Sequence, residues 1–145
     1  MEISTIAHAT DDLAKVQVAL IRLLPPLLKD RQLFTRKYME GHHGNPIVTF
    51  EAKLTKPSDV EEFKAFFRKV LSNTDKLMVK RNLDLHSDAE GNLYIRIDKQ
   101  QSFRGKIQLG DNDPIRVRMK FSRFTSDFTR LMINYLESDE PVKIS

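Results

Sequence analysis

Alternating apolar and polar positions predict several short strands along the chain. The clearest run covers residues 115–121, where the apolar side chains of Ile115, Val117, Met119 and Phe121 alternate with Arg116, Arg118 and Lys120. Because successive side chains of a strand point to opposite faces, this strand has one apolar and one basic face. Similar patterns predict strands at residues 3–9, 33–40, 47–55, 93–98 and 107–109.

Apolar residues at helical spacing predict helices between these strands. Residues 10–12, with the sequence Thr-Asp-Asp, supply an N-cap and an acidic first turn, and the apolar stripe that follows ends at Pro25. A second helix is expected to open near Ser58, with Glu61 in the register of a capping box, and a third covers residues 74–82. The remaining stripes are the phenylalanines Phe63, Phe66 and Phe67, which we interpret as core, and a C-terminal amphipathic set, Phe124, Phe128, Leu131, Met132 and Tyr135.

The order of these elements predicts an α+β fold. Strands follow one another both through tight turns and through helices, so a mostly antiparallel sheet with helices packed on one face accommodates them. The other face of the sheet is then open to a ligand. We expect one α+β domain over residues 1–123, followed by an amphipathic helix and a polar tail over residues 124–145.

Composition excludes several protein classes. The chain has 145 residues and no cysteine, which rules out a disulfide framework and suits a reducing cytoplasm. No stretch approaches the roughly 20 apolar residues of a membrane span, and the first residues lack the pattern of a secretory signal. A cytoplasmic location is therefore expected.

Positive charge is concentrated in the last strands. The net charge is only +4, yet residues 102–123 hold six cations, Arg104, Lys106, Arg116, Arg118, Lys120 and Arg123, against Asp111 and Asp113. Such a surface favours a polyanion, most simply RNA. On an open sheet face, Arg116, Arg118 and Lys120 would lie about 7 Å apart and could each contact a different phosphate. The same charges also suit a merely solvated strand face.

The loop at residues 41–47 combines two glycines, two histidines, an asparagine and a proline between two predicted strands. Gly44 suits a backbone with positive φ, and the side chains of His42, His43 and Asn45 can donate to or accept from a ligand. The same composition is typical of a simple hairpin connection. Neighbouring histidines in extended backbone point to opposite faces, and no cysteine is near, so we predict no metal site and no cofactor.

No convincing catalytic arrangement is present in the sequence. The chain lacks a phosphate-binding glycine loop, and Asp98 is best interpreted as a helix N-cap with Lys99 as a surface cation. We predict no catalytic residues and no enzyme activity. The alternative is a hydrolase or nuclease in which His42, His43 and Asp98 transfer protons.

Four short motifs resemble those of an archaeal RNA-binding-domain family of predicted exosome subunits, which is related in fold to the large-subunit ribosomal protein that binds 5S RNA. They are residues 7–12 (Ala-His-Ala-Thr-Asp-Asp), 41–47, 97–100 (Ile-Asp-Lys-Gln) and 113–117 (Asp-Pro-Ile-Arg-Val), in the same order as in the family. The match covers about residues 3–121. The resemblance implies RNA binding in an archaeal cytoplasm, in RNA processing or ribosome-related work.

The leading hypothesis is a non-catalytic RNA-binding protein that recognises RNA by shape and backbone. Protein subunits of an RNA-processing complex and a second copy of the chain are further partners to consider. Another alternative is a structural adaptor that oligomerises through its C-terminal helix. The predicted RNA-binding residues are His42, His43, Asn45, Lys99, Gln100, Arg104, Arg116, Arg118 and Lys120.

Overall fold

The computed structural model describes residues 1–8, 10–121 and 127–137. Their elements, in chain order, are β1 (Glu2–His8), α1 (Leu13–Ile21), the 3-10 helix η1 (Pro26–Arg31), β2 (Thr35–Glu40), the 3-10 turn η2 (His42–Gly44), β3 (Pro46–Lys53), α2 (Pro57–Val70), α3 (Asn73–Arg81), α4 (Leu83–His86), β4 (Asn92–Ile97), α5 (Lys99–Phe103), β5 (Ile115–Lys120) and α6 (Phe128–Glu137).

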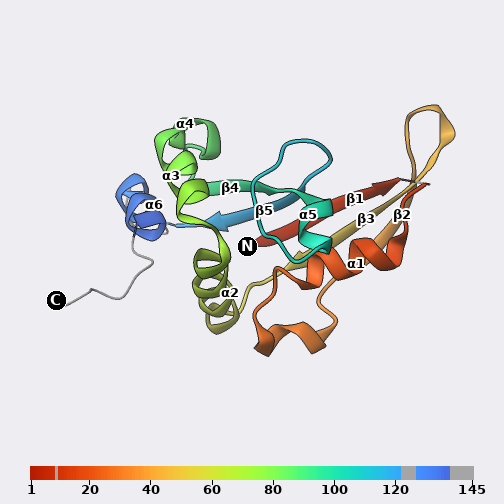
Figure 1. Cartoon of the computed structure of the whole chain (residues 1–145), viewed down its shortest axis with the longest axis horizontal. Coiled ribbons are helices and arrows are strands. Elements are labelled where there is room, and N and C mark those ends of the chain that lie inside the picture. The colour runs from red at the N-terminus through yellow and green to blue at the C-terminus, as the bar shows by residue number, and fades with distance from the viewer. Residues whose placement is uncertain (9, 122–126, 138–145) are drawn as a thin grey trace.

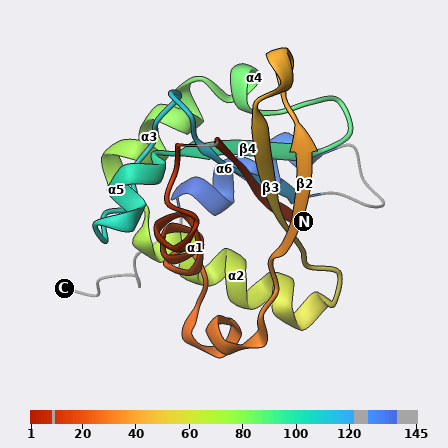
Figure 2. The same cartoon turned by 90° about the vertical axis from the view of Figure 1, so that its right-hand side faces the viewer.

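The five strands form one antiparallel sheet in the order β2-β3-β1-β5-β4. Helices α1 and α2 lie on the same side of this sheet, and α3, α4 and α6 gather at one end of it (Figures 1 and 2). The predicted α+β fold, with an antiparallel sheet and helices on one face, is confirmed. Its kinship to the ribosomal protein stays a prediction.

The core lies between the sheet and the helices. β1 contributes Ile3 and Ala7, β3 contributes Phe50, and the rings of Phe63 and Phe67 on α2 stack with centroids 5.2 Å apart. Both rings are fully buried, as expected from their helical spacing. Burial of each such side chain contributes roughly 1.5–3 kcal/mol, so this layer supplies most of the driving force that holds helices to sheet.

Helix α6 shares this core. Met132, Tyr135 and Leu136 belong to the same buried cluster, and the Tyr135 hydroxyl donates to the Lys64 carbonyl of α2 at 2.7 Å. The expected domain boundary at residue 123, together with Phe124 and the tail at residues 138–145, falls outside the described residues. The division therefore stays a prediction.

Four local predictions are wrong. The first turn of α1 holds no acidic residue, because the helix begins at Leu13, after both aspartates of residues 10–12. Residues 107–109 form no strand, because only Leu109 makes an isolated bridge, to Ile97. Helix α2 begins at Pro57 without a side-chain cap, so Ser58 is not its N-cap. Lys99 is not a surface cation, since its side chain is buried.

Candidate nucleic-acid interface

The open face of the sheet is lined by side chains that alternate with the core residues. On β5, Ile115, Val117 and Met119 are buried, whereas Arg116 and Lys120 are exposed and Arg118 is half-buried. The strand pairings place further polar side chains on the same face. Its charged residues on the strands are the cations Lys37, Lys53, Arg96, Arg116, Arg118 and Lys120 and the anions Glu2 and Glu51.

Two arginines face each other across the β4–β5 ladder. Arg96 pairs with Arg116, and both side chains are exposed. Residues directly opposite in an antiparallel pair have Cβ atoms about 4.5–5.5 Å apart, and like charges at that distance are destabilising. Arg96 reaches only the exposed carboxylate of Asp111, at 3.6 Å, and Arg116 makes no ion pair with any residue that the structure describes. This pair therefore leaves a site of positive charge that an anion would stabilise.

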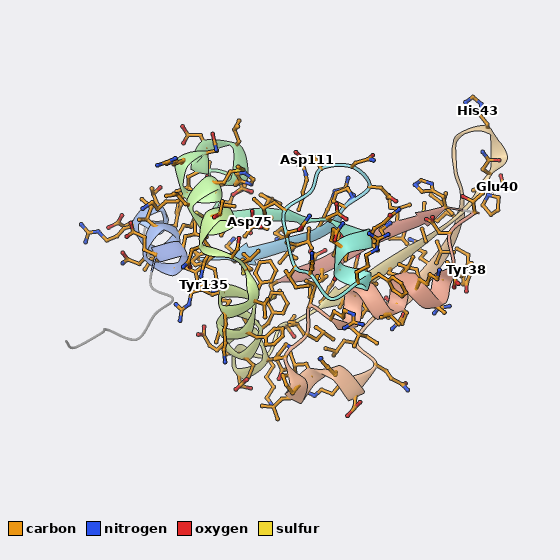
Figure 3. All side chains as sticks on the ribbon, viewed as in Figure 1. Tyr38, Glu40, His43, Asp75, Asp111 and Tyr135 are labelled. Carbon is orange, nitrogen blue, oxygen red and sulfur yellow. The ribbon has the colours of Figure 1, made fainter. Side chains whose placement is uncertain are left out.

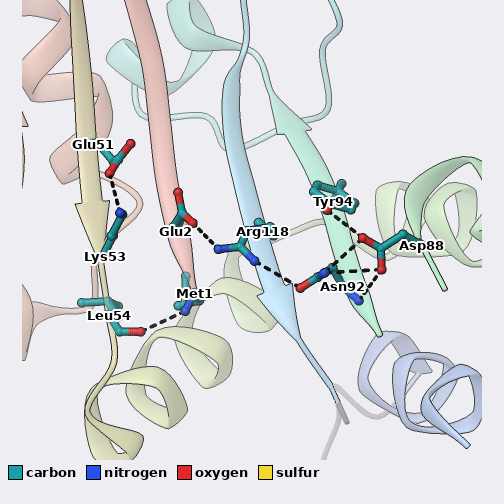
Figure 4. Close-up of polar contacts among 9 residues, drawn as sticks. All are labelled: Met1, Glu2, Glu51, Lys53, Leu54, Asp88, Asn92, Tyr94 and Arg118. Atoms are coloured by element: carbon teal, nitrogen blue, oxygen red, sulfur yellow. Dashed lines mark hydrogen bonds and ion pairs between the residues drawn. The ribbon is translucent and has the colours of Figure 1, made fainter. Parts of the chain in front are cut away.

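Arg118 differs from its neighbours because it is held by the protein (Figure 4). Its guanidinium donates to the Glu2 carboxylate and to Asn92 Oδ1, the latter at 3.3 Å. Asn92 in turn donates from Nδ2 to Asp88 Oδ2 at 3.0 Å, and the Tyr94 hydroxyl donates to the same oxygen at 2.8 Å. The network fixes Arg118 in place and partly neutralises it.

Hydrogen bonds in this network shift two pKa values. The backbone N–H of Asn92, followed by the side chains of Asn92 and Tyr94 and the backbone N–H of Glu90, lowers the pKa of Asp88 well below its usual range. The bond to Asp88 in turn raises the pKa of Tyr94. Tyr94 is 41% exposed, and its pairing with Arg118 places it beside the arginines of the open face.

A shallow pocket of about 290 Å³ lies between α1 and α5. Three of the motifs identified in the sequence meet there, since its lining includes Asp11, Lys99 and Asp113. The Lys99 ammonium donates to the Ile6 carbonyl at 2.7 Å and to Asp113 Oδ1 at 3.0 Å. Its role in the fold is thus to tie the loop before β5 to β1. The complete lining is Asp11, Asp12, Lys15, Val16, Ala19, Lys99, Gln100, Phe103, Arg104 and Asp113.

Gln100 and Arg104 lie exposed at the rim of this pocket, unlike Lys99. His8 comes from the same motif as Asp11, and its Nε2 lies 3.8 Å from Asp113 Oδ1. Asp113 itself adopts a left-handed backbone conformation with φ of 50°. The sequence motifs gave no indication of this contact, because residues 8 and 113 approach only through the β1–β5 pairing.

The histidine-rich loop is a tight connection between β2 and β3. The Gly41 N–H donates to the Asn45 carbonyl at 2.6 Å, and Gly44 has a φ of 76°, as its predicted role requires. His43 also has a positive φ, of 66°, and lies at the tip of the hairpin (Figure 3). Asn45 is exposed beside it. The structure thus gives this loop, which contains His42, a clear role in chain reversal.

The sequence-predicted residues therefore fall into three places. Arg116, Arg118 and Lys120 share the open face, Lys99, Gln100 and Arg104 surround the pocket, and the loop residues lie at the hairpin tip. Arg96 was not among the predicted residues, although its alternation with Ile95 and Ile97 is the same signal that identified Arg116. Contacts of any of these residues with RNA stay predictions.

Asp98, which the sequence offered as a candidate for proton transfer, has a structural role. Asp98 Oδ1 accepts from the Gln101 N–H at 2.9 Å and caps α5, which confirms its predicted structural role. Within the described part of the chain, no three His, Asp or Glu side chains are placed to hold a metal ion.

Of the helices described, none has the length and apolar character needed to cross a membrane.

Comparison with known proteins gives matches along most of the chain. Residues 1–121 match the model of a family described as RNA binding. The chain is 32% identical over 126 residues to a protein named RNA-binding protein PAB1135 of Pyrococcus abyssi, a match that covers 86% of this chain and 82% of that protein. It is 30% identical over 131 residues to the uncharacterized protein MJ0213 of Methanocaldococcus jannaschii, covering 86% and 85% of the two chains.

The fold also matches a solved structure. The crystal structure of protein AF2318 from Archaeoglobus fulgidus is 28% identical and has a TM-score of 0.77. The match covers 90% of this chain and 96% of that one.

Proposed function

Since this chain belongs to the RNA-binding family whose model it matches over residues 1–121, we propose that it binds RNA through the open face of its sheet. The observation that carries this proposal is the pairing of Arg96 with Arg116. A phosphate between the two guanidiniums would convert a like-charge repulsion into charge-assisted hydrogen bonds, which arginine makes in bidentate geometry.

The same face offers a path for a longer stretch of backbone. Arg116, Arg118 and Lys120 repeat every second residue, about 7 Å apart. Tyr94 lies opposite Arg118 and can stack on an unpaired base, an interaction worth about 1–3 kcal/mol per base. Because phosphate contacts and stacking carry little base information, we propose recognition by backbone and shape with weak sequence preference.

The other predicted residues are assigned secondary roles in this proposal. Gln100 and Arg104 at the pocket rim, and His43 and Asn45 at the hairpin tip, would contact RNA that extends beyond the open face. Lys99 would act indirectly, by holding Asp113 and the loop before β5. His42, the neighbour of His43 in the same loop, would contribute to the same contact with RNA.

Cross-linking tests this proposal directly. RNA that contains 4-thiouridine is bound to the protein, irradiated, digested and mapped by mass spectrometry. We expect adducts in the peptides that carry β4 and β5, above all at Tyr94. Adducts confined to α1 and α2, on the covered side of the sheet, would overturn the assignment of the open face.

We also propose that the protein is not a catalyst and that it acts in the cytoplasm with an RNA-processing assembly or the ribosome. The first part rests on the structural use of Asp98, and the second on the resemblance of the sequence motifs. Incubation with labelled RNA should leave the RNA intact. Isolation of the tagged protein from an archaeal cell should recover exosome or ribosome components, and recovery of neither would contradict the second part.

A further inference from the structure

Strand β2 is an edge of the sheet that the protein leaves uncovered. All six of its residues are exposed, with Tyr38 at 69% and Met39 at 46%. Tyr38 and Glu40 of this strand are labelled in Figure 3. At the opposite edge, β4 is covered by isolated bridges from Ser87 to Leu93 and from Leu109 to Ile97. No described strand pairs with the outer side of β2 (Figure 2). An uncovered edge strand is a ready site for pairing with another strand.

The hairpin defines which backbone groups point outward. The Gly41 N–H donates to the Asn45 carbonyl, so these two residues form a hydrogen-bonded pair. Hydrogen-bonded and non-hydrogen-bonded pairs alternate along β2–β3 from this point. The next pair, Glu40 with Pro46, is not hydrogen-bonded, in keeping with the missing N–H of proline. This alternation turns the N–H and C=O groups of Arg36, Tyr38 and Glu40 away from β3. These three residues present the hydrogen-bonding edge.

The charges on this edge are complementary to themselves. In an antiparallel pairing of two β2 strands about a two-fold axis at Tyr38, Arg36 of each copy lies opposite Glu40 of the other. Opposite charges in directly facing positions stabilise a strand pair. A pairing centred on residue 36 or on residue 37 would instead place Arg36 or Lys37 against itself. The charges therefore favour the register centred on Tyr38 over these two registers.

We propose that β2 is an interface with a second copy of this chain, paired antiparallel about Tyr38. The proposed contact consists of the six residues of the strand, so the interface is small and weak, and we expect a dissociation constant of about 10–500 µM. The two-fold axis stands perpendicular to the sheet, which places both open faces on the same side. This inference concerns self-association and is tested without RNA, independently of the proposed function.

Charge reversal at the two facing positions tests the register. Sedimentation equilibrium of the parent should give a monomer–dimer equilibrium, and Arg36→Glu or Glu40→Arg alone should weaken it at least tenfold. An equimolar mixture of the two single variants should form a heterodimer, because each pair of facing residues is then again of opposite charge. The double variant, with both substitutions in one chain, should recover the parent dimer.

Matched controls separate the edge from net charge. Lys69→Glu and Glu62→Arg reverse exposed charges on α2 and should leave association unchanged. Arg36 also packs over the ring of Phe50, at 4.9 Å from the centroid, so circular dichroism and thermal melting are measured for each variant. Recovery in the mixture cannot arise from misfolded chains. A parent that stays monomeric to 500 µM, or a dimer that is insensitive to both reversals, would overturn the proposal.

Discussion

Removing three cations of β4 and β5 from the open face should weaken RNA binding in a predictable way. The variant replaces Arg96, Arg116 and Lys120 with Gln and retains Arg118, which Glu2 already partly neutralises. Each lost phosphate contact reduces the slope of log affinity against log salt by about 0.7–0.9, so the triple variant should lose about 2–3 units of slope. Fluorescence anisotropy of a labelled RNA between 50 and 300 mM salt measures this.

The same substitution should act on stability in the opposite direction. Removing the repulsion between Arg96 and Arg116 should leave the free energy of unfolding unchanged or raise it by up to about 1 kcal/mol. Chemical denaturation therefore separates a binding defect from a folding defect. A variant that loses RNA binding while gaining stability has lost contacts with the ligand.

A second triple variant controls for net charge. Lys56, Lys69 and Arg81 are exposed on or next to the helices α2 and α3, and their replacement by Gln removes the same total charge. This control should retain most of the parent's salt slope. Equal slopes for the two triple variants would refute the reasoning, because binding would then depend on total charge and not on the open face.

Three further predictions concern the framework. Gly110→Ala should cost about 1–3 kcal/mol in urea unfolding, because a Cβ there would lie 2.8 Å from Cβ of Asp98 and 3.0 Å from its Cα; a wild-type midpoint would contradict this. Lys99→Met should destabilise by about 1–3 kcal/mol, because it removes the donor from Asp113 and from the partly buried Ile6 carbonyl, whereas a lysine that only contacted RNA would leave stability unchanged. Asp88→Asn should reduce the loss of stability on acidification, because folding lowers the pKa of the Asp88 carboxyl. Such a carboxyl stabilises the fold above its unfolded pKa and loses that contribution as pH falls toward its folded pKa. Parallel curves of unfolding free energy against pH for parent and variant, between pH 6 and 2, would argue against it.

Local sequence signals predicted the parts of the fold that depend on local physics. Residues 10–12 were expected to supply an N-cap for the first helix, and one of them does, since Asp12 Oδ1 accepts from the Ala14 N–H at 2.9 Å. The alternation in residues 115–121 gave the correct buried face of β5, and Gly44 has the positive φ that its loop requires. In each case a single turn or strand determines the outcome.

Features that depend on distant partners could not be predicted in this way. Lys99 follows a helix cap and looks like a surface cation, yet its acceptor Ile6 lies 93 residues away. The opposition of Arg96 and Arg116 depends on the register between β4 and β5. Alternation alone does not determine this register, because a shift by any even number of residues keeps the same side chains on the same face. The candidate site was thus predictable in its residue types and strand faces but not in its pairings.

The central position of β1 has a consequence for how this chain reaches its native state. β1 lies between β3 and β5, and its ion pair from Glu2 to Arg118 joins residues 116 positions apart. Such non-local pairing raises contact order, which slows folding because a long loop must close before the contacts between β1 and β5 form. During synthesis, the innermost strand therefore waits with one side unpaired until β5 has left the ribosome. Over that interval the apolar residues of β1 are exposed to solvent, and such surface promotes the aggregation that chaperones prevent.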